Sequence, residues 1–268
     1  MKLKDWINKN QSVFIQRDLN LILHSFFSQK RYYFIEDYTP TSYQMQYLKI
    51  LKEAYCKGWP LPYLIRKEEF FGFRFFVKRG IFIPRPETEI IVEKALEIIN
   101  RNRMKRILDL CCGSCCIAIT LRKKTHKNSI VYASDIDEEA LRVSRENIRL
   151  HKVKIHLVRS DLFSAFKGKT FDVIVSNPPY VESGQIKGTL HFEPLKALDG
   201  GKNGLFFIYK ILKKAPFYLK RGGCLILEMG YNHKDRVDKK LKDEGKFTVK
   251  EWIEDYSGFT RGVVLQLN

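Results

Sequence analysis

Hydrophobic positions follow a helical period at the start of the chain and other periods further on. Apolar residues recur at helical spacing over residues 3–7, 19–27 and 43–55, which predicts a mainly helical region up to about residue 55. The sequence Gly-Trp-Pro-Leu-Pro at 58–62 then interrupts the pattern and is typical of a connection between structural elements.

Aromatic and β-branched residues dominate the next segment. Residues 69–77 and the run Ile-Phe-Ile at 81–83 are separated by a short connection that contains Gly80. Two such runs around a glycine-containing connection predict a β-hairpin. We therefore expect the chain to turn at residues 78–80.

Short apolar runs alternate with helical patterns from residue 85 onward. The runs predict strands at 106–110, 130–134, 155–158, 171–175 and 224–228. The patterns between them predict helices at 87–99, 117–122, 138–150 and 205–219. This alternation is the signature of an α/β fold with a doubly wound, mainly parallel sheet. Two further runs, 247–252 and 262–267, have no helix expected between them, so we expect an antiparallel C-terminal hairpin at the edge of the sheet.

The patterns divide the chain into three parts: a helical domain over residues 1–66, a β-hairpin linker over 67–84 and an α/β domain over 85–268. No apolar run approaches the roughly 18 residues of a membrane span. The first residues also lack the apolar core of a signal peptide. We therefore expect a cytoplasmic protein that does not enter a membrane.

The chain is strongly basic, since 48 Lys and Arg against 30 Asp and Glu give a formal net charge of +18. Residues 1–100 contribute +5 and residues 101–268 contribute +13, so the excess is not confined to one tail. Such a balance favours an anionic partner, which can be nucleic acid, a ribonucleoprotein or an acidic protein. A lysine-rich composition that only increases solubility explains the same numbers, and charge alone does not separate the two explanations.

The predicted strand at 171–175 leads into the sequence Asn177-Pro178-Pro179-Tyr180. Proline has a carbonyl group but no N–H, so this backbone accepts hydrogen bonds without donating them. A residue that precedes proline is biased toward an extended conformation, which limits the freedom of the loop. With the Asn177 side-chain oxygen and the flat ring of Tyr180, the loop predicts a rigid acceptor site for a planar group that carries an –NH2.

Acidic residues end three of the other predicted strands. Asp109 leads into a tight turn with Gly113, and Asp135 follows 22 residues after that glycine, near the spacing of an acid that binds a ribose. Asp161 ends the third strand, where Leu162 can press on a ring. Ligands of open α/β sheets bind at the carboxyl ends of the strands. The sequence therefore predicts a cofactor site at this edge of the sheet.

These motifs, in their order along the chain, resemble those of class I S-adenosylmethionine-dependent methyltransferases. The segments that carry the resemblance are Asp109–Ala118, Ala133–Asp135, Ser160–Asp161 and Asn177–Tyr180. The sequence Ile-Pro-Arg-Pro-Glu-Thr-Glu at 83–89, with Phe-Phe-Gly at 70–72 before it, resembles the protein-glutamine methyltransferases that modify peptide chain release factors, the HemK/PrmC type. The similarity runs from about residue 60 to residue 268.

The resemblance implies a Rossmann-like fold and methyl transfer from S-adenosylmethionine, which becomes S-adenosylhomocysteine, to the side-chain amide nitrogen of a glutamine in release factors. It assigns cofactor binding to Cys111, Cys112, Gly113, Ser114, Cys115, Asp135, Asp161, Leu162 and Asn177. It assigns acceptor binding to Asn177, Pro178, Pro179 and Tyr180, with catalytic roles for Asn177, Pro178 and Tyr180. Residues 1–66 would recognise the protein substrate. We expect a monomer without a metal, whose basic surface brings it transiently near ribosomes or nucleic acid.

Three other functions fit parts of the pattern. A methyltransferase of adenine amino groups in DNA or RNA shares the Asn-Pro-Pro-Tyr sequence and would explain the charge, but the chain lacks a separate target-recognition region. An enzyme that methylates a glutamine of a ribosomal protein shares all of these motifs. A binding module with a degenerate glycine loop is the third, and intact Asp135 and Asp161 argue against it.

Four cysteines, Cys111, Cys112, Cys115 and Cys116, are clustered within six positions. The family's glycine loop usually reads Asp-Leu-Gly-Thr-Gly-Ser-Gly, or has Cys at its third position, so residues 109–115 depart from it mainly at Cys112 and Cys115. A side chain at Cys115 in particular can crowd the approach of a cofactor. Cysteine is small and apolar, so simple tolerance is one explanation. A redox pair of Cys112 and Cys115 is another, and it requires lowered thiol pKa values at a helix start. Zinc is the third, although no second cysteine pair is present to complete a tetrahedral site.

Overall fold

The computed structural model describes residues 1–26 and 38–268. These residues form two compact units, Met1–Lys67 and Glu68–Asn268. The last residue of the apolar pattern expected at 19–27 lies outside the described residues. No helix in the described part of the chain has the length and apolar composition needed to cross a membrane.

The first unit is built from helices, as the apolar spacing predicts. They are α1 (Leu3–Asn10), α2 (Gln16–Phe26), α3 (Ser42–Cys56) and α4 (Leu61–Ile65). Thr41 and Gln44 form a capping box that starts α3, because each side chain accepts a backbone N–H of the other residue. The short helix α4 was not expected. It packs into the same apolar cluster as α1 through Leu61 and Ile65.

A two-stranded sheet of β1 (Lys67–Phe70) and β2 (Phe73–Phe76) follows. Its turn consists of Phe71 and Gly72, which have φ values of 52° and 71°. Two consecutive residues with positive φ are what a tight two-residue hairpin requires. The turn predicted at residues 78–80 is therefore wrong, and residues 81–83 form no strand.

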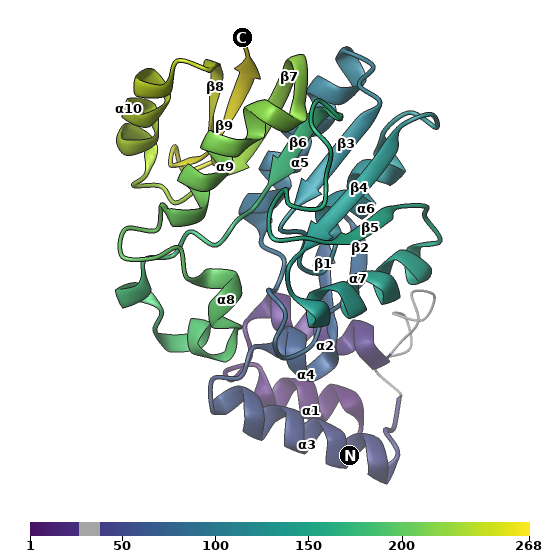
Figure 1. Ribbon diagram of the computed structural model, residues 1–268. Helices are drawn as coiled ribbons and strands as arrows, with labels where there is room; N and C mark the ends of the chain where they lie inside the picture. Colours follow the sequence, from purple (N-terminus) through teal and green to yellow (C-terminus); the bar gives the residue numbers. More distant parts are fainter. Residues whose placement is uncertain (27–37) are drawn as a thin grey trace. The chain divides into compact units, whose positions relative to one another are not determined.

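The second unit contains a seven-stranded sheet in the order β5-β4-β3-β6-β7-β9-β8 (Figure 1). Its strands are β3 (Arg106–Leu110), β4 (Ile130–Asp135), β5 (His156–Arg159), β6 (Phe171–Ser176), β7 (Leu219–Glu228), β8 (Phe247–Glu254) and β9 (Thr260–Leu267). Strands β3 to β7 are parallel, whereas β9 pairs antiparallel with both β7 and β8. The predicted doubly wound, mainly parallel sheet and its antiparallel C-terminal hairpin are confirmed. Within the hairpin, β8 is the edge strand of the sheet, and β9 lies between β8 and β7.

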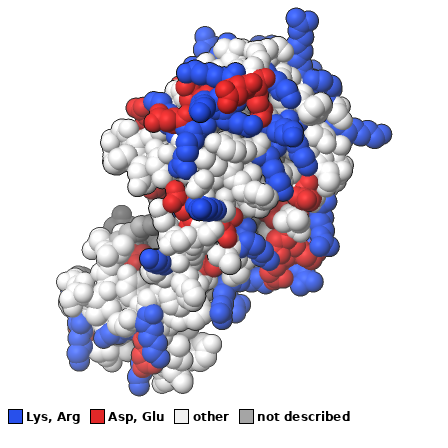
Figure 2. All heavy atoms as spheres, turned by 60° about the vertical axis from the view of Figure 1, so that its left-hand side comes forward, with Lys and Arg blue, Asp and Glu red and all other residues white. Residues whose placement is uncertain are grey.

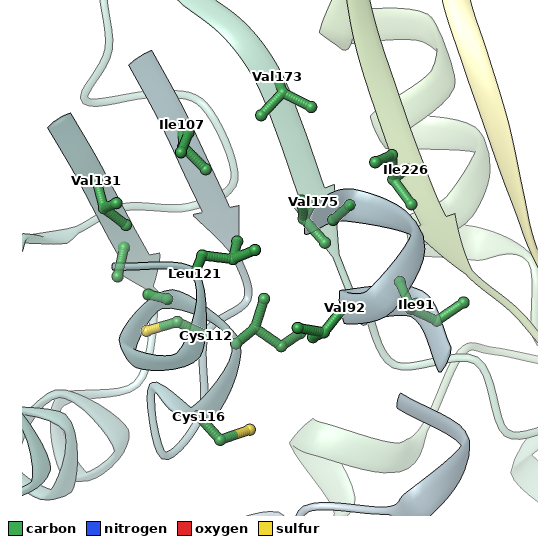
Figure 3. Packing of buried hydrophobic residues seen from close by; sticks show 14 of the residues in the cluster. Ile91, Val92, Ile107, Cys112, Cys116, Leu121, Val131, Val173, Val175 and Ile226 are labelled. Carbon is green, nitrogen blue, oxygen red and sulfur yellow. The ribbon is translucent and has the colours of Figure 1, made fainter. Parts of the chain in front are cut away.

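Helices cover both faces of this sheet, which explains the nearly continuous apolar runs of its strands. These helices are α5 (Pro86–Arg101), α6 (Cys116–Lys124), α7 (Glu138–His151), α9 (Phe206–Tyr218) and α10 (Lys234–Glu244). The short helix α8 (Leu195–Leu198) lies beyond the strand ends (Figure 1). Alternation along β6 separates the two cores. Val173 and Val175 pack with α5 and α6 (Figure 3), and Ile174 packs with α9 and α10. Helix α10 was not expected.

Candidate active site

A cavity of about 760 Å³ opens at the carboxyl ends of β3, β4 and β6. Its size is that of a small-molecule site. The predicted cofactor and acceptor residues that line it are Cys111, Cys112, Gly113, Ser114, Asp135, Asp161, Leu162, Asn177 and Pro179. Three other predicted residues do not line it, namely Cys115, Pro178 and Tyr180. Sequence reasoning missed the apolar part of the wall, to which Ile81, Phe82 and Phe207 contribute.

The turn from β3 into α6 forms the floor of the cavity. Three of its residues have positive φ: Cys111 at 64°, Gly113 at 53° and Cys115 at 68°. The buried carboxylate of Asp109 accepts the backbone N–H of Ala118 at 2.9 Å and so fixes the start of α6 against β3. Burial raises the pKa of Asp109 to about 7. Asp109 therefore stabilises the turn through this hydrogen bond and does not line the cavity.

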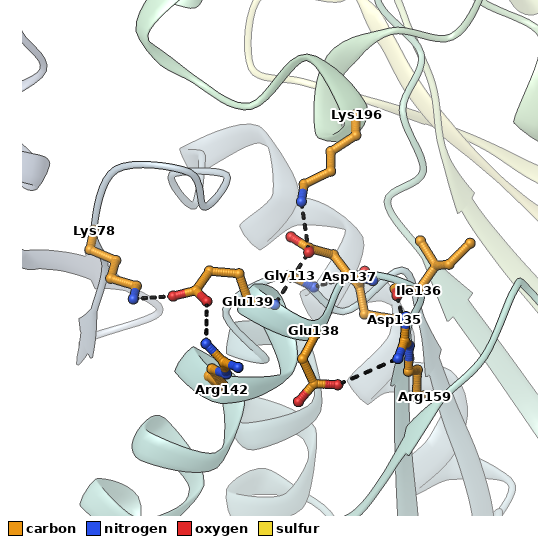
Figure 4. A network of polar contacts seen from close by, with 10 residues as sticks. All are labelled: Lys78, Gly113, Asp135, Ile136, Asp137, Glu138, Glu139, Arg142, Arg159 and Lys196. Carbon is orange, nitrogen blue, oxygen red and sulfur yellow. Dashed lines mark hydrogen bonds and ion pairs between the residues drawn. The ribbon is translucent and has the colours of Figure 1, made fainter.

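Asp135 joins this turn to the end of β4 (Figure 4). Its Oδ2 accepts the N–H of Gly113 at 2.9 Å, and its Oδ1 accepts the N–H of Asp137 at 2.9 Å. Burial raises the pKa of Asp135, and the backbone hydrogen bonds oppose that rise. A side chain built on Gly113 would meet no atom within 4 Å, so its backbone is open to a ligand on that side.

Cys112 and Cys115 belong to the apolar core that also contains residues of α5 and α6, and the Cys112 sulfur lies 3.7 Å from the hydroxyl of Ser144 on α7. Cys115 is completely buried, and Cys112 is 5% exposed. A hydrogen bond with Cys115, together with burial, raises the pKa of the Cys112 thiol. The redox-pair explanation required a lowered thiol pKa, and that expectation is wrong for Cys112. No three His, Cys, Asp or Glu residues within 1–26 and 38–268 are placed to hold a metal ion.

We call Asn177–Tyr180 the acceptor loop. Its Asn177 end is anchored by Thr88 in the first turn of α5. The amide nitrogen of Asn177 donates to the hydroxyl oxygen of Thr88 at 3.1 Å. Thr88 is 2% exposed, so this contact is shielded from water. Because the nitrogen is engaged, the Asn177 oxygen remains available as an acceptor at the cavity wall.

Glu228 at the end of β7 anchors the Tyr180 end of the loop. The Tyr180 hydroxyl donates to Glu228 Oε1 at 3.1 Å. Burial raises the pKa of Glu228 to about 7, even though Thr88 and Tyr180 both stabilise its charged form. Burial also raises the pKa of Tyr180. The buried groups Thr88 and Glu228 thus hold the two ends of the loop.

His233 lies behind Tyr180, with the two rings edge to face at a centroid distance of 6.3 Å. It is 1% exposed, and burial lowers its pKa to about 4. Its Nδ1 accepts the backbone N–H of Gly230 at 3.2 Å. A neutral, buried imidazole of this kind packs against the loop from behind. The sequence alone favours a surface position for His233, and that prediction is wrong because α10, which His233 precedes, was not expected.

Ion pairs join segments that surround the cavity (Figure 4). Lys196 of α8 pairs with Asp137 at 2.6 Å, and both residues line the cavity. Glu193 pairs with Arg85 and also accepts the N–H of Ile83 at 3.0 Å. The motif at 83–89 is therefore held against the segment that leads to α8. Neither Lys196 nor Arg85 was among the predicted site residues.

The arrangement of strand ends, acidic residues and acceptor loop is that of a methyltransferase. The sequence profile of the family described as "Methyltransferase small domain" matches residues 88–259. Solved structures with a similar fold include a methyltransferase from Pyrococcus furiosus, 19% identical, with a TM-score of 0.53 over 85% of this chain and 98% of that one. TYW2 from M. jannaschii in complex with AdoMet is 17% identical, with a TM-score of 0.51 over 75% of this chain and 84% of that one.

Curated relatives define the family more narrowly. The release factor glutamine methyltransferase of Thermodesulfovibrio yellowstonii is 37% identical over 99% of this chain and 96% of its own length. The protein of the same name from Aquifex aeolicus is 34% identical over 99% of this chain and 96% of its own length. The chain belongs to the family of release factor glutamine methyltransferases.

Proposed function

We propose that this protein transfers a methyl group from S-adenosylmethionine to the side-chain amide nitrogen of a glutamine in peptide chain release factors, and so tunes translation termination. The observation that carries the proposal is that Asn177 and Pro179 of the Asn-Pro-Pro-Tyr sequence line the cavity, in a chain that matches a release factor glutamine methyltransferase over 99% of its length. Ribosomal-protein glutamine and nucleic-acid adenine are not favoured, because the two relatives described above, which match 99% of this chain, are named release factor glutamine methyltransferases.

The cavity fits S-adenosylmethionine in size and in the chemistry of its wall. The open backbone at Gly113 admits the close approach of a ligand, and the carboxylates of Asp135 and Asp161 can accept hydroxyl hydrogen bonds. Leu162 and the aliphatic Ile81 supply apolar surface for a flat ring. The bound cofactor supplies an electrophilic methyl group on a sulfonium.

The acceptor nitrogen needs orientation more than activation. An amide nitrogen is a weak nucleophile because its lone pair is delocalised into the carbonyl group. The Asn177 side-chain oxygen and the Pro178 carbonyl accept the two amide hydrogens, which holds the nitrogen toward the methyl group. Such positioning can contribute on the order of 7–11 kcal/mol to catalysis. Transfer would be direct and in line, without a covalent enzyme intermediate. The bond from nitrogen to the methyl carbon would form as the bond from that carbon to the sulfonium sulfur breaks, and one amide proton would pass to water.

Tyr180 covers the acceptor amide from its anchored position beside Glu228. Residues 1–66 recognise the release factor, 67–84 form a linker and 85–268 carry out the transfer. The protein works as a monomer in the cytoplasm, where release factors act. These assignments follow from the sequence motifs and the family. Truncation tests the roles of the three parts of the chain, and light scattering tests whether the protein is a monomer.

Asn177→Ala provides the direct test of the acceptor site. With a purified release factor and labelled S-adenosylmethionine, we expect Asn177→Ala to abolish glutamine methylation while cofactor affinity stays within a few-fold of the wild type. Asn128→Ala, at an exposed position outside the cavity, is the matched control and should retain full activity. Undiminished methylation by Asn177→Ala would refute the mechanism. Label in ribosomal proteins or nucleic acids alone would refute the substrate.

A further inference from the structure

The excess positive charge is gathered at one edge of the sheet. Five adjacent strands, β5, β4, β3, β6 and β7, each begin at a short basic segment. We call these segments together the basic rim: residues 152–154, 122–127, 101–106, 167–169 and 220–221. They contain 14 Lys and Arg and no Asp or Glu. Figure 2 shows many Lys and Arg side chains over the upper end of the methyltransferase unit, with a group of Asp and Glu side chains among them.

The opposite edge of the sheet has the reverse balance. Around the cavity, residues 135–137, 160–162 and 177–204 carry six Asp and Glu against three Lys. A composition that is merely lysine-rich would place its excess on both edges. The separation therefore favours the first of the two explanations for the net charge, an anionic partner that binds at the basic rim.

A second cavity of about 320 Å³ lies within the basic rim. Arg103, Lys105, Lys220 and Arg221 line it together with a single carboxylate, Asp172. That carboxylate is already engaged, since it accepts the backbone N–H of Lys105 at 3.1 Å and the ammonium of Lys220 at 2.7 Å. Among the described residues, no carboxylate is ion-paired with Arg103, Lys105 or Arg221. This cavity therefore suits an anion such as a phosphate group.

An aromatic ring stands at the same edge. Phe217 lies in the last turn of α9 and is 61% exposed, and its carbonyl accepts the N–H of Lys169 at 2.8 Å. The ammonium of Lys246 lies 5.3 Å from the ring centroid. Exposed aromatic rings among cationic side chains are the surfaces on which nucleic-acid bases stack.

We propose that the basic rim binds the sugar–phosphate backbone of a nucleic acid. Five adjacent strands at about 4.8 Å spacing extend the rim over about 19 Å, which spans several phosphates rather than one small anion. The regular charge of a polynucleotide and the exposed ring of Phe217 favour this partner over an acidic protein. The rim and the cofactor cavity lie at opposite ends of β3–β6, which are about 13–20 Å long. A bound nucleic acid therefore leaves the cavity open to a protein substrate.

The test compares two triple variants that remove the same charge. The rim variant carries Arg103→Gln, Lys105→Gln and Arg221→Gln. The control carries Lys187→Gln, Lys202→Gln and Lys250→Gln, which are exposed positions outside the rim. Fluorescence anisotropy measures the binding of labelled single-stranded RNA, single-stranded DNA of the same sequence and polyglutamate, each between about 50 and 200 mM salt. Release factor methylation by each variant shows whether it is folded.

We expect RNA and DNA to bind the wild type with similar, steep salt dependence, because the contacts are to phosphates. The rim variant should bind at least tenfold more weakly at the lowest salt. Its log–log salt slope should fall by about 2, from the loss of three phosphate contacts at about 0.7 each. The control should stay within twofold of the wild type, and the rim variant should keep its methyltransferase activity. Equal losses in both variants, no binding at low salt, or equally tight binding of polyglutamate would each overturn the proposal.

Discussion

Replacing Glu228 by Gln should change how the stability of the protein depends on pH. Glu228 is 1% exposed at the end of β7, where the hydroxyl groups of Tyr180 and Thr88 are hydrogen-bonded to its carboxyl group. Burial raises its pKa from an ordinary value of 4.5 to about 7. Glutamine keeps the shape and an acceptor oxygen for Tyr180, but it does not titrate.

The direction of the pKa shift determines whether Glu228 stabilises the folded protein at low or at high pH. The unfolded chain releases the proton near pH 4.5, whereas the folded protein holds it up to about pH 7. The stabilising contribution of the protonated carboxyl is thus complete below about pH 4.5 and is lost as the pH rises through 7. A shift of about 2.5 units corresponds to a loss of about 3 kcal/mol.

Urea unfolding at pH 5 and pH 8, followed by circular dichroism, measures the effect. The free energy of unfolding of Glu228→Gln minus that of the wild type should be about 2–3 kcal/mol larger at pH 8 than at pH 5, because only the wild type loses stability over this range. Asp109, which has its own raised pKa, titrates in both proteins and cancels. Glu146→Gln, at an exposed position on α7, is the control and should show no such change. An equal difference at both pH values would show that Glu228 is not protonated in the folded state and would refute the reasoning.

Two further substitutions test how the site is built. Thr88→Val removes the hydroxyl that holds the Asn177 amide, so kcat should fall about tenfold, the equivalent of one hydrogen bond. The KM for the cofactor should be unchanged, Thr88→Ser should restore the rate, and failure of that rescue would limit Thr88 to a packing role. Cys115→Gly should be about 1 kcal/mol more stable than Cys115→Ala in urea unfolding, because only glycine relieves the positive φ of 68°. Equal stability of the two variants would mean that this backbone carries no strain.

The sequence was most informative where burial is strongest. The strand over 106–110 is found at its predicted residues because an apolar run covered on both faces has few alternatives. In the hairpin, by contrast, aromatic residues continue through the turn, so the apolar pattern gave no sign that Phe71 adopts positive φ. Helix α10 was missed because only Val237 and Leu241 are buried along it, too few to mark a helical period.

In the candidate site, too, residues at strand ends could be predicted, whereas residues on irregular segments could not. Parallel strands end at one edge, so the predicted residues after β3, β4 and β6 come together at the cavity wall without knowledge of any loop. Lys196 and Phe82 join that wall from irregular segments, whose path the sequence pattern does not determine. The burial of His233 was also beyond prediction, since it depends on the close approach of Gly204, where a side chain would collide with the carbonyl of Tyr180.

The positive φ values at Cys111 and Cys115 have a consequence for the detection of distant relatives. Both residues adopt a conformation that normally selects glycine, yet hydrogen bonds from the neighbouring strand and helix still hold the turn in shape. The surrounding fold, rather than glycine at positions 111 and 115, therefore determines the shape of the turn from β3 into α6. A motif search that demands glycine at these positions would reject this chain, whereas one based on the acids at the strand ends and the Asn-Pro-Pro-Tyr sequence would retain it.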